Sequence, residues 1–450
     1  MNLYAFIKKV IRNLSYKFPG GVSGNLLSLY KGRGLGCLYR EFGKKAVLDE
    51  LLFRRYTGNR EYCKLKEKLD LIREKNVITV VFQVWNLAKW KCDSVYHAMK
   101  KHPRFNPIIW LADEPGAIEA ELIDMRNQMN QFFDLSHYSV IWANSWDELD
   151  KKTPPDIIFL QDHYPRYINR IPVILNRILC NVRYGLANTN LKESYNYFLS
   201  NYAFFNFTEN ASVFKEQKEI LSSKGRNMVI TGHPIVDSFN KLRNSKNSVW
   251  KNCSKQLKKI IWAPHWTISN DARFCPATFL KYSHFMLELA NKYQDEIQIA
   301  FKPHPMLYRT LCEHPDWGQK RAEAYYKQWA TMHNTQIEEG DYIELFLQSD
   351  AIIHDSGSFI LEYLIVNKPC MYLQKEKKNA WNPHFNEMNK EALKCYTLGY
   401  CQDDIENFII DIVQDNNDDK RILRHNFYDN YLLPPNSISA ADNIINAILG

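Results

Sequence analysis

Four short loops of this 450-residue chain place a histidine within two residues of a proline, and each follows an apolar run. Histidine changes its charge near neutral pH, so it can move a proton or, when charged, bind a phosphate. Proline fixes the backbone nearby and limits where the ring can lie. The loops are Gln161-Asp162-His163-Tyr164-Pro165, Gly232-His233-Pro234, Ala263-Pro264-His265-Trp266-Thr267 and Lys302-Pro303-His304-Pro305.

A fifth loop, Asp355-Ser356-Gly357-Ser358, stands between an apolar run and an expected helix at Phe359–Val366. A small, hydroxyl-rich turn at a helix start presents free backbone N–H groups and the positive end of the helix dipole, which suits a phosphate. Gly357 allows close approach, and the two serines can donate further hydrogen bonds. Ordinary helix capping by Asp355 or Ser358 is the alternative.

The elements that must position these loops are short apolar runs alternating with amphipathic segments, the rhythm of parallel sheets covered by helices. We expect a first series of strands at Val77–Phe82, Ile108–Ala112, Asp156–Leu160 and Phe204–Phe207. A second series is expected at Met228–Thr231, Lys258–Ala263, Ile297–Lys302, Ala351–His354 and Cys370–Leu373. Helices are expected at Asp93–Lys101, Ala117–Phe133, Glu209–Arg226 and Ser437–Leu449.

Two such series predict an α/β protein with two Rossmann-like domains facing a cleft, the GT-B arrangement, preceded by a basic helical segment. The expected parts are a basic segment at 1–70, a first Rossmann-like domain at 71–225, a second at 226–436 and a C-terminal helix at 437–450. Ligands of open α/β sheets bind beyond the carboxyl ends of the strands. The five loops therefore mark the expected site.

The charge of the chain is unevenly distributed. Residues 1–70 hold 15 Lys and Arg against 6 Asp and Glu, a net +9, while the whole chain carries +8, which leaves −1 for the remainder. A basic amphipathic helix near the start favours the surface of an anionic membrane, and a helix packed on the body with a solvated basic face is the alternative. No nucleic-acid-binding motif accompanies the charge.

Other classes are disfavoured by what the sequence lacks. No apolar stretch approaches the roughly 18 residues of a transmembrane helix, and no secretory signal opens the chain. The ten cysteines form no CxxC pair, so neither a zinc site nor a disulfide framework is indicated. We expect a cytoplasmic protein that needs no metal or cofactor.

The stretch from Asp341 to Glu362, with Lys368-Pro369 and Met371-Tyr372 after it, resembles the signature block of the CDP-glycerol glycerophosphotransferases, which build teichoic-acid-type polymers. Three upstream loops are similar to the family's Arg/Lys-x-His-Pro, Ala-Pro-Thr-Trp/Phe-Arg and Gly-x-Pro-Arg-x-Asp motifs. They begin at Lys302, Ala263 and Gly232. The resemblance covers about residues 228–373. It implies that the domain at 226–436 binds the nucleotide donor and the domain at 71–225 the acceptor.

The resemblance implies transfer of glycerophosphate, or a related alditol phosphate, from a CDP-activated donor to a hydroxyl of a cell-surface polymer or lipid-linked glycan. CMP would be released, and the protein would act in envelope or capsule synthesis on the inner face of the cell membrane. The residues expected to bind the donor are Lys302, His233, His265, Asp355, Ser356, Gly357, Ser358 and Glu362, the last through a ribose hydroxyl. Those expected to be catalytic are His304 at the donor phosphates and Asp162 or His163 as the base.

The chain departs from the family pattern in three places. Thr267 stands where the family has an arginine, and Ser356 and Gly357 stand where it has a tyrosine and a serine. The family's Trp-His-Gly motif, which supplies a catalytic histidine, is replaced by Arg183-Tyr184-Gly185. A GT-B glycosyltransferase using a nucleotide sugar therefore stays an alternative. A hydrolysing sugar-nucleotide epimerase and a non-catalytic assembly partner are weaker ones.

Overall fold

The computed structural model describes residues 58–114, 117, 119–134, 137–160, 176–191, 195–196, 198–221, 223–268, 277–377, 384–412 and 418–450. It consists of two compact units. Of the described residues, those from 58 to 185, 190 to 234 and 434 to 450 form the first unit, and those from 186 to 189 and 235 to 433 form the second. The basic segment expected at 1–70 lies outside the described residues up to position 57.

The first unit contains a seven-stranded parallel sheet in the order β3-β2-β1-β4-β5-β6-β7. Its strands are β1 (Ile78–Val84), β2 (Phe105–Leu111), β3 (Val140–Trp142), β4 (Ile157–Leu160), β5 (Ile178–Asn181), β6 (Phe205–Thr208) and β7 (Met228–Ile230). β1 is central and rich in β-branched residues, as expected for a strand covered on both faces. Pro107 lies in β2 before the pairing with β3 begins at Ile109, so its missing N–H breaks no ladder bond there.

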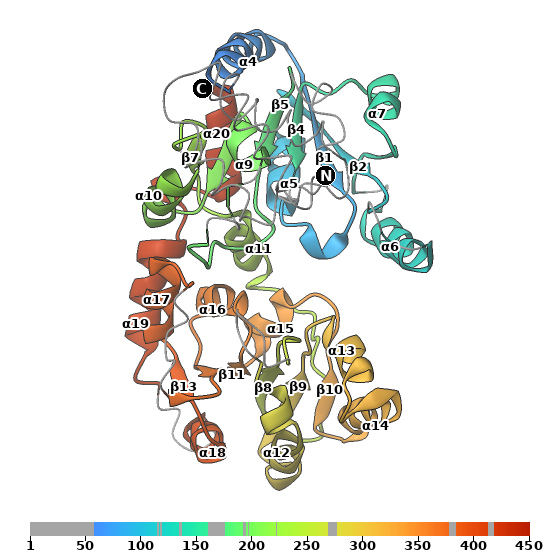
Figure 1. Ribbon diagram of the computed structural model, residues 1–450, viewed down its shortest axis with the longest axis vertical. Helices are drawn as coiled ribbons and strands as arrows, with labels where there is room; N and C mark the ends of the chain where they lie inside the picture. The colour runs from blue at the N-terminus through green and yellow to red at the C-terminus, as the bar shows by residue number, and fades with distance from the viewer. Residues whose placement is uncertain are drawn as a thin grey trace, which may run out of the picture. The chain divides into compact units, whose positions relative to one another are not determined.

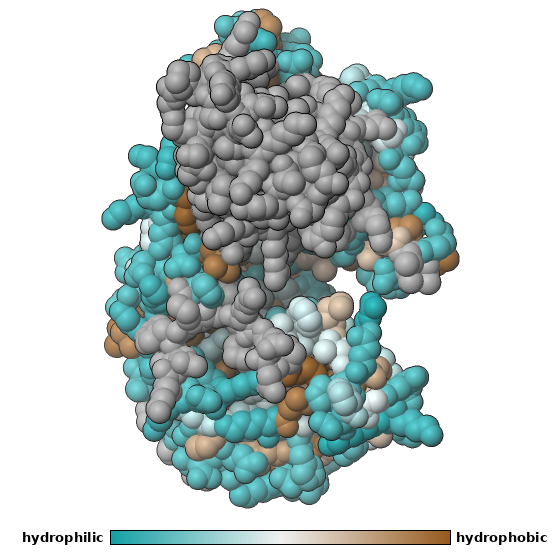
Figure 2. Space-filling model, in the orientation of Figure 1, coloured by the Kyte–Doolittle hydropathy of each residue, from teal (hydrophilic) through white to brown (hydrophobic). Residues whose placement is uncertain are grey.

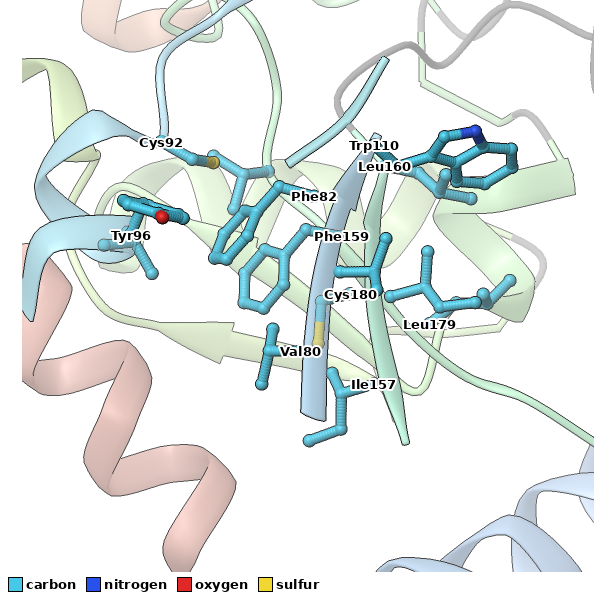
Figure 3. Close-up of a cluster of buried hydrophobic side chains, with 14 of the residues drawn as sticks. Val80, Phe82, Cys92, Tyr96, Trp110, Ile157, Phe159, Leu160, Leu179 and Cys180 are labelled. Atoms are coloured by element: carbon cyan, nitrogen blue, oxygen red, sulfur yellow. The ribbon is translucent and has the colours of Figure 1, made fainter. Parts of the chain in front are cut away.

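Helices flank this sheet (Figure 1). They are α4 (Gly58–Arg73), α5 (Asp93–Lys101), α6 (Glu119–Phe132), α7 (Trp146–Lys152), α9 (Phe198–Tyr202), α10 (Ala211–Ile220) and α20 (Ala440–Leu449), with the short η2 (Leu87–Lys89). α11 (Pro234–Leu242) begins at the last residue of this unit and leads into the second. The core is apolar and aromatic; Phe82 and Phe159 stack with ring centroids 4.6 Å apart (Figure 3).

The C-terminal helix α20 belongs to the first unit although the chain reaches it from the second. Ile444 and Ile448 are fully buried in the first core. The guanidinium of Arg73 donates to the carbonyl of Ile448 at 2.8 Å, which places a cation at the negative end of α20. The C-terminus accordingly lies beside α4 (Figure 1).

The second unit contains a six-stranded parallel sheet in the order β10-β9-β8-β11-β12-β13. Its strands are β8 (Lys258–Ala263), β9 (Ile297–Phe301), β10 (Thr335–Ile337), β11 (Ala351–His354), β12 (Cys370–Leu373) and β13 (Thr397–Gly399). Its helical segments are α12 (Phe279–Lys292), α13 (Leu307–Glu313), α14 (Gly318–Thr331), α15 (Ile343–Gln348), α16 (Phe359–Glu362), η5 (Tyr363–Val366), α17 (Glu387–Lys394), α18 (Gln402–Ile410), α19 (Arg421–Phe427) and η8 (Tyr428–Leu432). The turn η9 (Pro435–Ser437) belongs to the first unit. In the second core, the rings of Trp262 and Phe301 stack with their centroids 5.1 Å apart, and the ring of Trp329 contacts both.

Every predicted strand is present, but one lies in the other sheet. The strand expected at Met228–Thr231 to open the second series is β7, which pairs with β6 and closes the first sheet. The division between the units therefore falls after Pro234, later than the expected boundary near 225. The helix expected at Glu209–Arg226 ends at Ile220, and Gly225 then adopts a φ of +75°.

Within the described part of the chain, no helix combines the length and the apolar character needed to cross a membrane. The face drawn in Figure 2 is mostly hydrophilic where it is coloured, with hydrophobic residues in small patches.

Candidate active site

Three of the five predicted loops meet at one edge of the second sheet. They follow β9, β8 and β11, which are neighbours in the sheet and run parallel. Parallel strands bring their carboxyl ends to the same edge, where ligands of open α/β sheets bind. The backbone N–H of His304 donates to the carbonyl of Pro264 at 3.1 Å, which joins the β9 loop to the β8 loop.

The rings of His265 and His304 contact each other at this edge. Their centroids are 4.8 Å apart, at an interplanar angle of 65°. The indole of Trp266 lies beside both rings, 5.9 Å from His265 and 6.1 Å from His304, and is 36% exposed. Two imidazoles and one accessible aromatic face thus form a single group.

Local hydrogen bonds orient the two imidazoles. Nδ1 of His304 accepts from the backbone N–H of Met306 at 3.1 Å, so this nitrogen carries no proton and Nε2 carries it instead. Nδ1 of His265 lies 2.8 Å from the hydroxyl oxygen of Thr267. Both rings are therefore held through Nδ1.

Burial keeps both imidazoles neutral at pH 7. It lowers the pKa of His304 to about 4. Burial, together with the neighbouring His304, lowers the pKa of His265 to about 3. Each ring can therefore donate one hydrogen bond without carrying a charge before a ligand arrives.

Asp355 ties the loops together rather than lining the site. Its side chain accepts from the backbone N–H of His265 at 2.6 Å through one oxygen. The other oxygen accepts from the N–H and the hydroxyl of Thr278, at 2.5 and 2.7 Å. Burial raises the pKa of Asp355 to about 6 against these hydrogen bonds. Three protein donors satisfy the carboxylate, so its role is to position His265.

The turn after Asp355 is the part of the β11 loop that reaches solvent. Ser356 and Gly357 are buried, whereas Ser358 is exposed and precedes α16. The hydroxyls of Ser356 and Ser358 lie 3.2 Å apart. The helix predicted at Phe359–Val366 is present as α16 followed by η5. Hydroxyl and backbone donors thus stand at the same sheet edge as the histidine pair.

Lys302 is placed differently from the expectation. Only 6% of it is exposed, and its ammonium group donates to the carbonyls of Gly340 at 2.7 Å and Glu338 at 3.4 Å. These bonds hold the segment between β10 and α15 against the end of β9. The cation is thus committed to backbone carbonyls.

Glu362 is buried instead of lying on a solvated helix face, and only 4% of it is exposed. Burial and the adjacent Glu362, which hydrogen-bonds to the phenol, raise the pKa of Tyr342 well above its ordinary value. Glu362 therefore anchors α16 to the start of α15. Tyr342 and Thr278 were not singled out from the sequence, because both are partners of a carboxylate that is distant in the chain.

His233 belongs to the first unit, whereas the other predicted donor-binding residues belong to the second. Its Nε2 lies 2.9 Å from the carbonyl oxygen of Arg183. Burial lowers the pKa of His233, so the neutral ring donates this hydrogen bond. It thereby holds the segment Arg183-Tyr184-Gly185.

The remaining predicted residues, Asp162 and His163, lie outside the described residues. Among the residues that the structure does describe, no group of three or more His, Cys, Asp or Glu could hold a metal ion.

Solved structures with a similar fold include two groups of proteins. A variant of the wall teichoic acid polymerase TagF matches with a TM-score of 0.58 and 16% identity, over 90% of this chain and 95% of that one. The UDP-GlcNAc 2-epimerase from Neisseria meningitidis, bound to UDP-GlcNAc, matches with a TM-score of 0.52 and 15% identity, over 83% and 99%. S. aureus MnaA with UDP gives 0.51 and 15%, over 83% and 96%. These likenesses show the fold, which is α/β and GT-B-like, as the sequence predicted.

No curated sequence matches the chain significantly. Residues 180–449, however, match the family described as CDP-Glycerol:Poly(glycerophosphate) glycerophosphotransferase. This range includes the end of β5, then β6 and β7 of the first sheet, the second unit and α20. Four of the five predicted loops lie within it. The chain therefore belongs to the CDP-glycerol:poly(glycerophosphate) glycerophosphotransferase family of enzymes.

Proposed function

We propose that this enzyme transfers glycerophosphate from CDP-glycerol to a hydroxyl at the end of a cell-surface polymer or a lipid-linked glycan. The observation that carries the proposal is the meeting of His265, His304 and the Ser356–Ser358 turn at one sheet edge, within the range that matches the family. A TagF structure of similar fold, obtained with CDPG, supports the choice of this donor.

The reaction would be a displacement at the glycerol-bearing phosphorus of CDP-glycerol. A new bond forms between this phosphorus and the acceptor oxygen, the bond to CMP breaks, and CMP leaves. Phosphoryl transfer requires positioning and charge stabilisation more than covalent participation of the protein. His304, His265 and the hydroxyls and backbone N–H groups of the β11 turn would bind the donor phosphates.

The acceptor hydroxyl must lose a proton, and we propose that Asp162 or His163 is the base that accepts it. Tyr184 stands where the family has its catalytic histidine, but a phenol has a pKa near ~10 and is a poor base at neutral pH. In this proposal, Tyr184 and Arg183 serve the acceptor side as groups held in place by His233. Substituting Asp162 and His163 singly by Asn identifies the base, because only the true base should be needed for turnover.

A second candidate is a GT-B glycosyltransferase that uses a nucleotide sugar. The replacement of the family's histidine by Tyr184 favours it, as do the neighbours of the same fold bound to UDP-GlcNAc and UDP. Purified protein should be incubated with a crude membrane acceptor and, in parallel, CDP-glycerol, CDP-ribitol and UDP-sugars. Acceptor-dependent release of CMP supports the first candidate, and release of UDP with inert CDP donors supports the second. Nucleotide binding without any turnover would point to a non-catalytic assembly partner.

We further propose that residues 1–70 bring the enzyme to the anionic inner face of the cell membrane, where a lipid-linked acceptor is found. The net charge of +9 in this segment supports the proposal. Deleting residues 1–18 should weaken binding to anionic liposomes, and more so at low salt, because salt screens exposed charges. Unchanged liposome binding of the deletion variant would refute it.

A further inference from the structure

The loops after β8 and β9 expose apolar side chains beside the histidine pair. In residues 264–268 and 302–306 the exposed residues are Trp266, Pro305 and Met306, whereas His265 and His304 are half-buried. A large apolar side chain that is exposed next to a few converging polar groups is typical of a ligand-binding surface. We therefore asked which part of a ligand the indole of Trp266 would contact.

Both imidazoles beside Trp266 carry their proton on Nε2. Nδ1 of His304 accepts from the backbone N–H of Met306 at 3.1 Å, and Nδ1 of His265 accepts from the backbone N–H of Thr267 at 3.4 Å. A neutral imidazole that accepts through Nδ1 donates through Nε2. The two ring centroids are 4.8 Å apart, so two N–H donors belong to one small group.

The indole of Trp266 contacts both of these rings. Its centroid lies 5.9 Å from that of His265 and 6.1 Å from that of His304, and its plane is tilted by 37° and 43° to theirs. A phosphate that accepts hydrogen bonds from the imidazoles therefore lies at the border of the indole. The group that reaches the indole is then the one bonded directly to this phosphate.

The chemistry of an aromatic face selects among the parts of a donor. The face of an indole is negatively polarised, which disfavours contact with the phosphate itself. The same face favours C–H groups, because they are apolar and weakly positive. The indole thus suits a carbon group attached to the phosphate.

CDP-glycerol has a carbon group at each end of its diphosphate, ribose at one end and glycerol at the other. The acceptor hydroxyl attacks the phosphorus that bears the glycerol, so this end of the donor has to stay accessible to a second substrate. Trp266 is the exposed ring of the cluster, whereas the two imidazoles are half-buried. The accessible ring therefore matches the accessible end of the donor.

We propose that Trp266 binds the glycerol of the donor, with the C–H groups of the glycerol on the indole face while His265 and His304 donate to the adjoining phosphate. Trp266 is then the residue that recognises the transferred group, as distinct from the nucleotide. This inference rests on the proposed function, because it takes CDP-glycerol as the donor.

The contact distinguishes CDP-glycerol from CDP, which has the same cytidine and diphosphate but no glycerol. Glycerol that covers part of the indole removes apolar area from water and strengthens binding by about fivefold to tenfold. Loss of the indole should therefore weaken binding of CDP-glycerol by this factor. The affinity for CDP should stay nearly the same, because its phosphates still meet both imidazoles.

The test is calorimetric titration of the full-length enzyme with CDP-glycerol and, separately, with CDP. Trp266→Ala should raise the Kd of CDP-glycerol by about fivefold to tenfold and that of CDP by less than about twofold. Trp266→Phe keeps an aromatic face and should recover most of the affinity for CDP-glycerol. Ile422→Ala is the matched control, since Ile422 is an exposed apolar residue on α19 of the same unit, and should change neither Kd. Thermal unfolding of each variant checks that it is folded.

The outcomes are distinguishable from those of the proposed function. Equal losses for CDP and CDP-glycerol in Trp266→Ala, or no loss for either, overturn the glycerol contact and leave the proposed donor standing. Parallel titrations use UDP-N-acetylglucosamine and UDP. If the wild type binds only these, the proposed donor is wrong, and a loss in Trp266→Ala for UDP-N-acetylglucosamine alone shows that the indole binds the transferred group of another donor. If no nucleotide binds, both proposals fail.

Discussion

Three buried histidines of the second unit should each make its folding less stable as the pH falls. Burial is the main cause that lowers the pKa of His265 and His354 to about 3 and of His304 to about 4. In the unfolded chain a histidine takes up its proton near ~6.5. The stability that these groups contribute is thus present above that pH. It is lost as the pH falls toward their pKa values in the folded protein, by up to about 1.4 kcal/mol per pH unit for each histidine. Asp355 opposes the trend, because its raised pKa of about 6 adds stability as the pH falls from about 6 to 3.8.

His354 allows a direct test of this acid sensitivity. Both ring nitrogens are buried without a hydrogen-bond partner in the described part of the chain, and the ring lies among Phe359, Tyr372 and Tyr396. His354→Phe should raise the free energy of unfolding by about 1 kcal/mol at pH 7, because it removes unsatisfied polar atoms. The gain should grow as the pH falls to 5. Denaturant unfolding at both pH values measures it, and a gain that shrinks at pH 5 would contradict burial of the imidazole as the source of the acid sensitivity.

His304 should matter for turnover far more than for stability. The ring sits in a loop at the sheet edge and is only partly buried. His304→Ala should lower kcat/KM by about 100-fold or more, the usual cost of losing a preorganised donor to a developing charge. Steady-state kinetics measures the loss, and the circular dichroism spectrum should be unchanged. His284→Ala on α12 is the matched control on the same unit, and an equal loss there would show that the effect is not specific to the site.

At the scale of elements, the turn between β7 and α11 is fixed by one glycine. Gly232 has a φ of +80°, and a Cβ there would lie 2.7 Å from the Cβ of Pro434. The carbonyl of the preceding Thr231 accepts from Asn443 at 3.3 Å. On the other side, His233 holds the carbonyl of Arg183. The C-terminal segment thus packs against the turn whose His233 holds the segment Arg183-Tyr184-Gly185.

Gly232→Ala should destabilise the enzyme by more than about 2 kcal/mol, since it adds a clash to the cost of a left-handed backbone. Gly318→Ala separates the two causes: Gly318 has a φ of +68° but nothing within 4 Å of a Cβ, so about 1 kcal/mol is expected there. Thermal and denaturant unfolding measure both variants. Equal losses at the two positions would mean that the contact with Pro434 contributes nothing.

The strands and loops of this fold were predictable from sequence to different degrees. Strands such as β1 and β8 can be recognised in the sequence as long apolar runs, because parallel strands are buried on both faces. The strands that were missed are β3, β5, β10 and β13, each of three or four residues, with polar residues or glycine in several of them. β7 was found but assigned to the wrong series, since pairing depends on distant residues. The same reason hid the contacts of Asp355 with Thr278 and of Lys302 with Gly340.

At the scale of the whole molecule, each unit has its own core. The C-terminal helix α20 belongs to the first unit, as does α4, where the described part of the chain begins. α20 completes the first core with Ala441, Ile444, Ile445 and Ile448. The two units should therefore respond separately to core substitutions. The family match, which ends at residue 449, therefore includes a helix that is buried in the core of the first unit.

Ile444→Ala should cost about 2–5 kcal/mol, because the side chain is fully buried and leaves a cavity. The loss should appear as faster hydrogen exchange in β1, β4 and β5 of the first unit. Ile422→Ala in α19, where the side chain is 73% exposed, is the control and should change little. Faster exchange spread equally over β8, β9 and β11 would contradict the separation into two cores.

The most direct test of the central claim follows both products of one reaction with the wild-type enzyme, CDP-glycerol labelled in the glycerol, and a membrane acceptor. The account predicts that CMP appears only when acceptor is present, and that labelled glycerophosphate enters the acceptor in equal amount. Release of CMP without transfer of label, or transfer of a sugar from a UDP donor with CDP-glycerol inert, would contradict it.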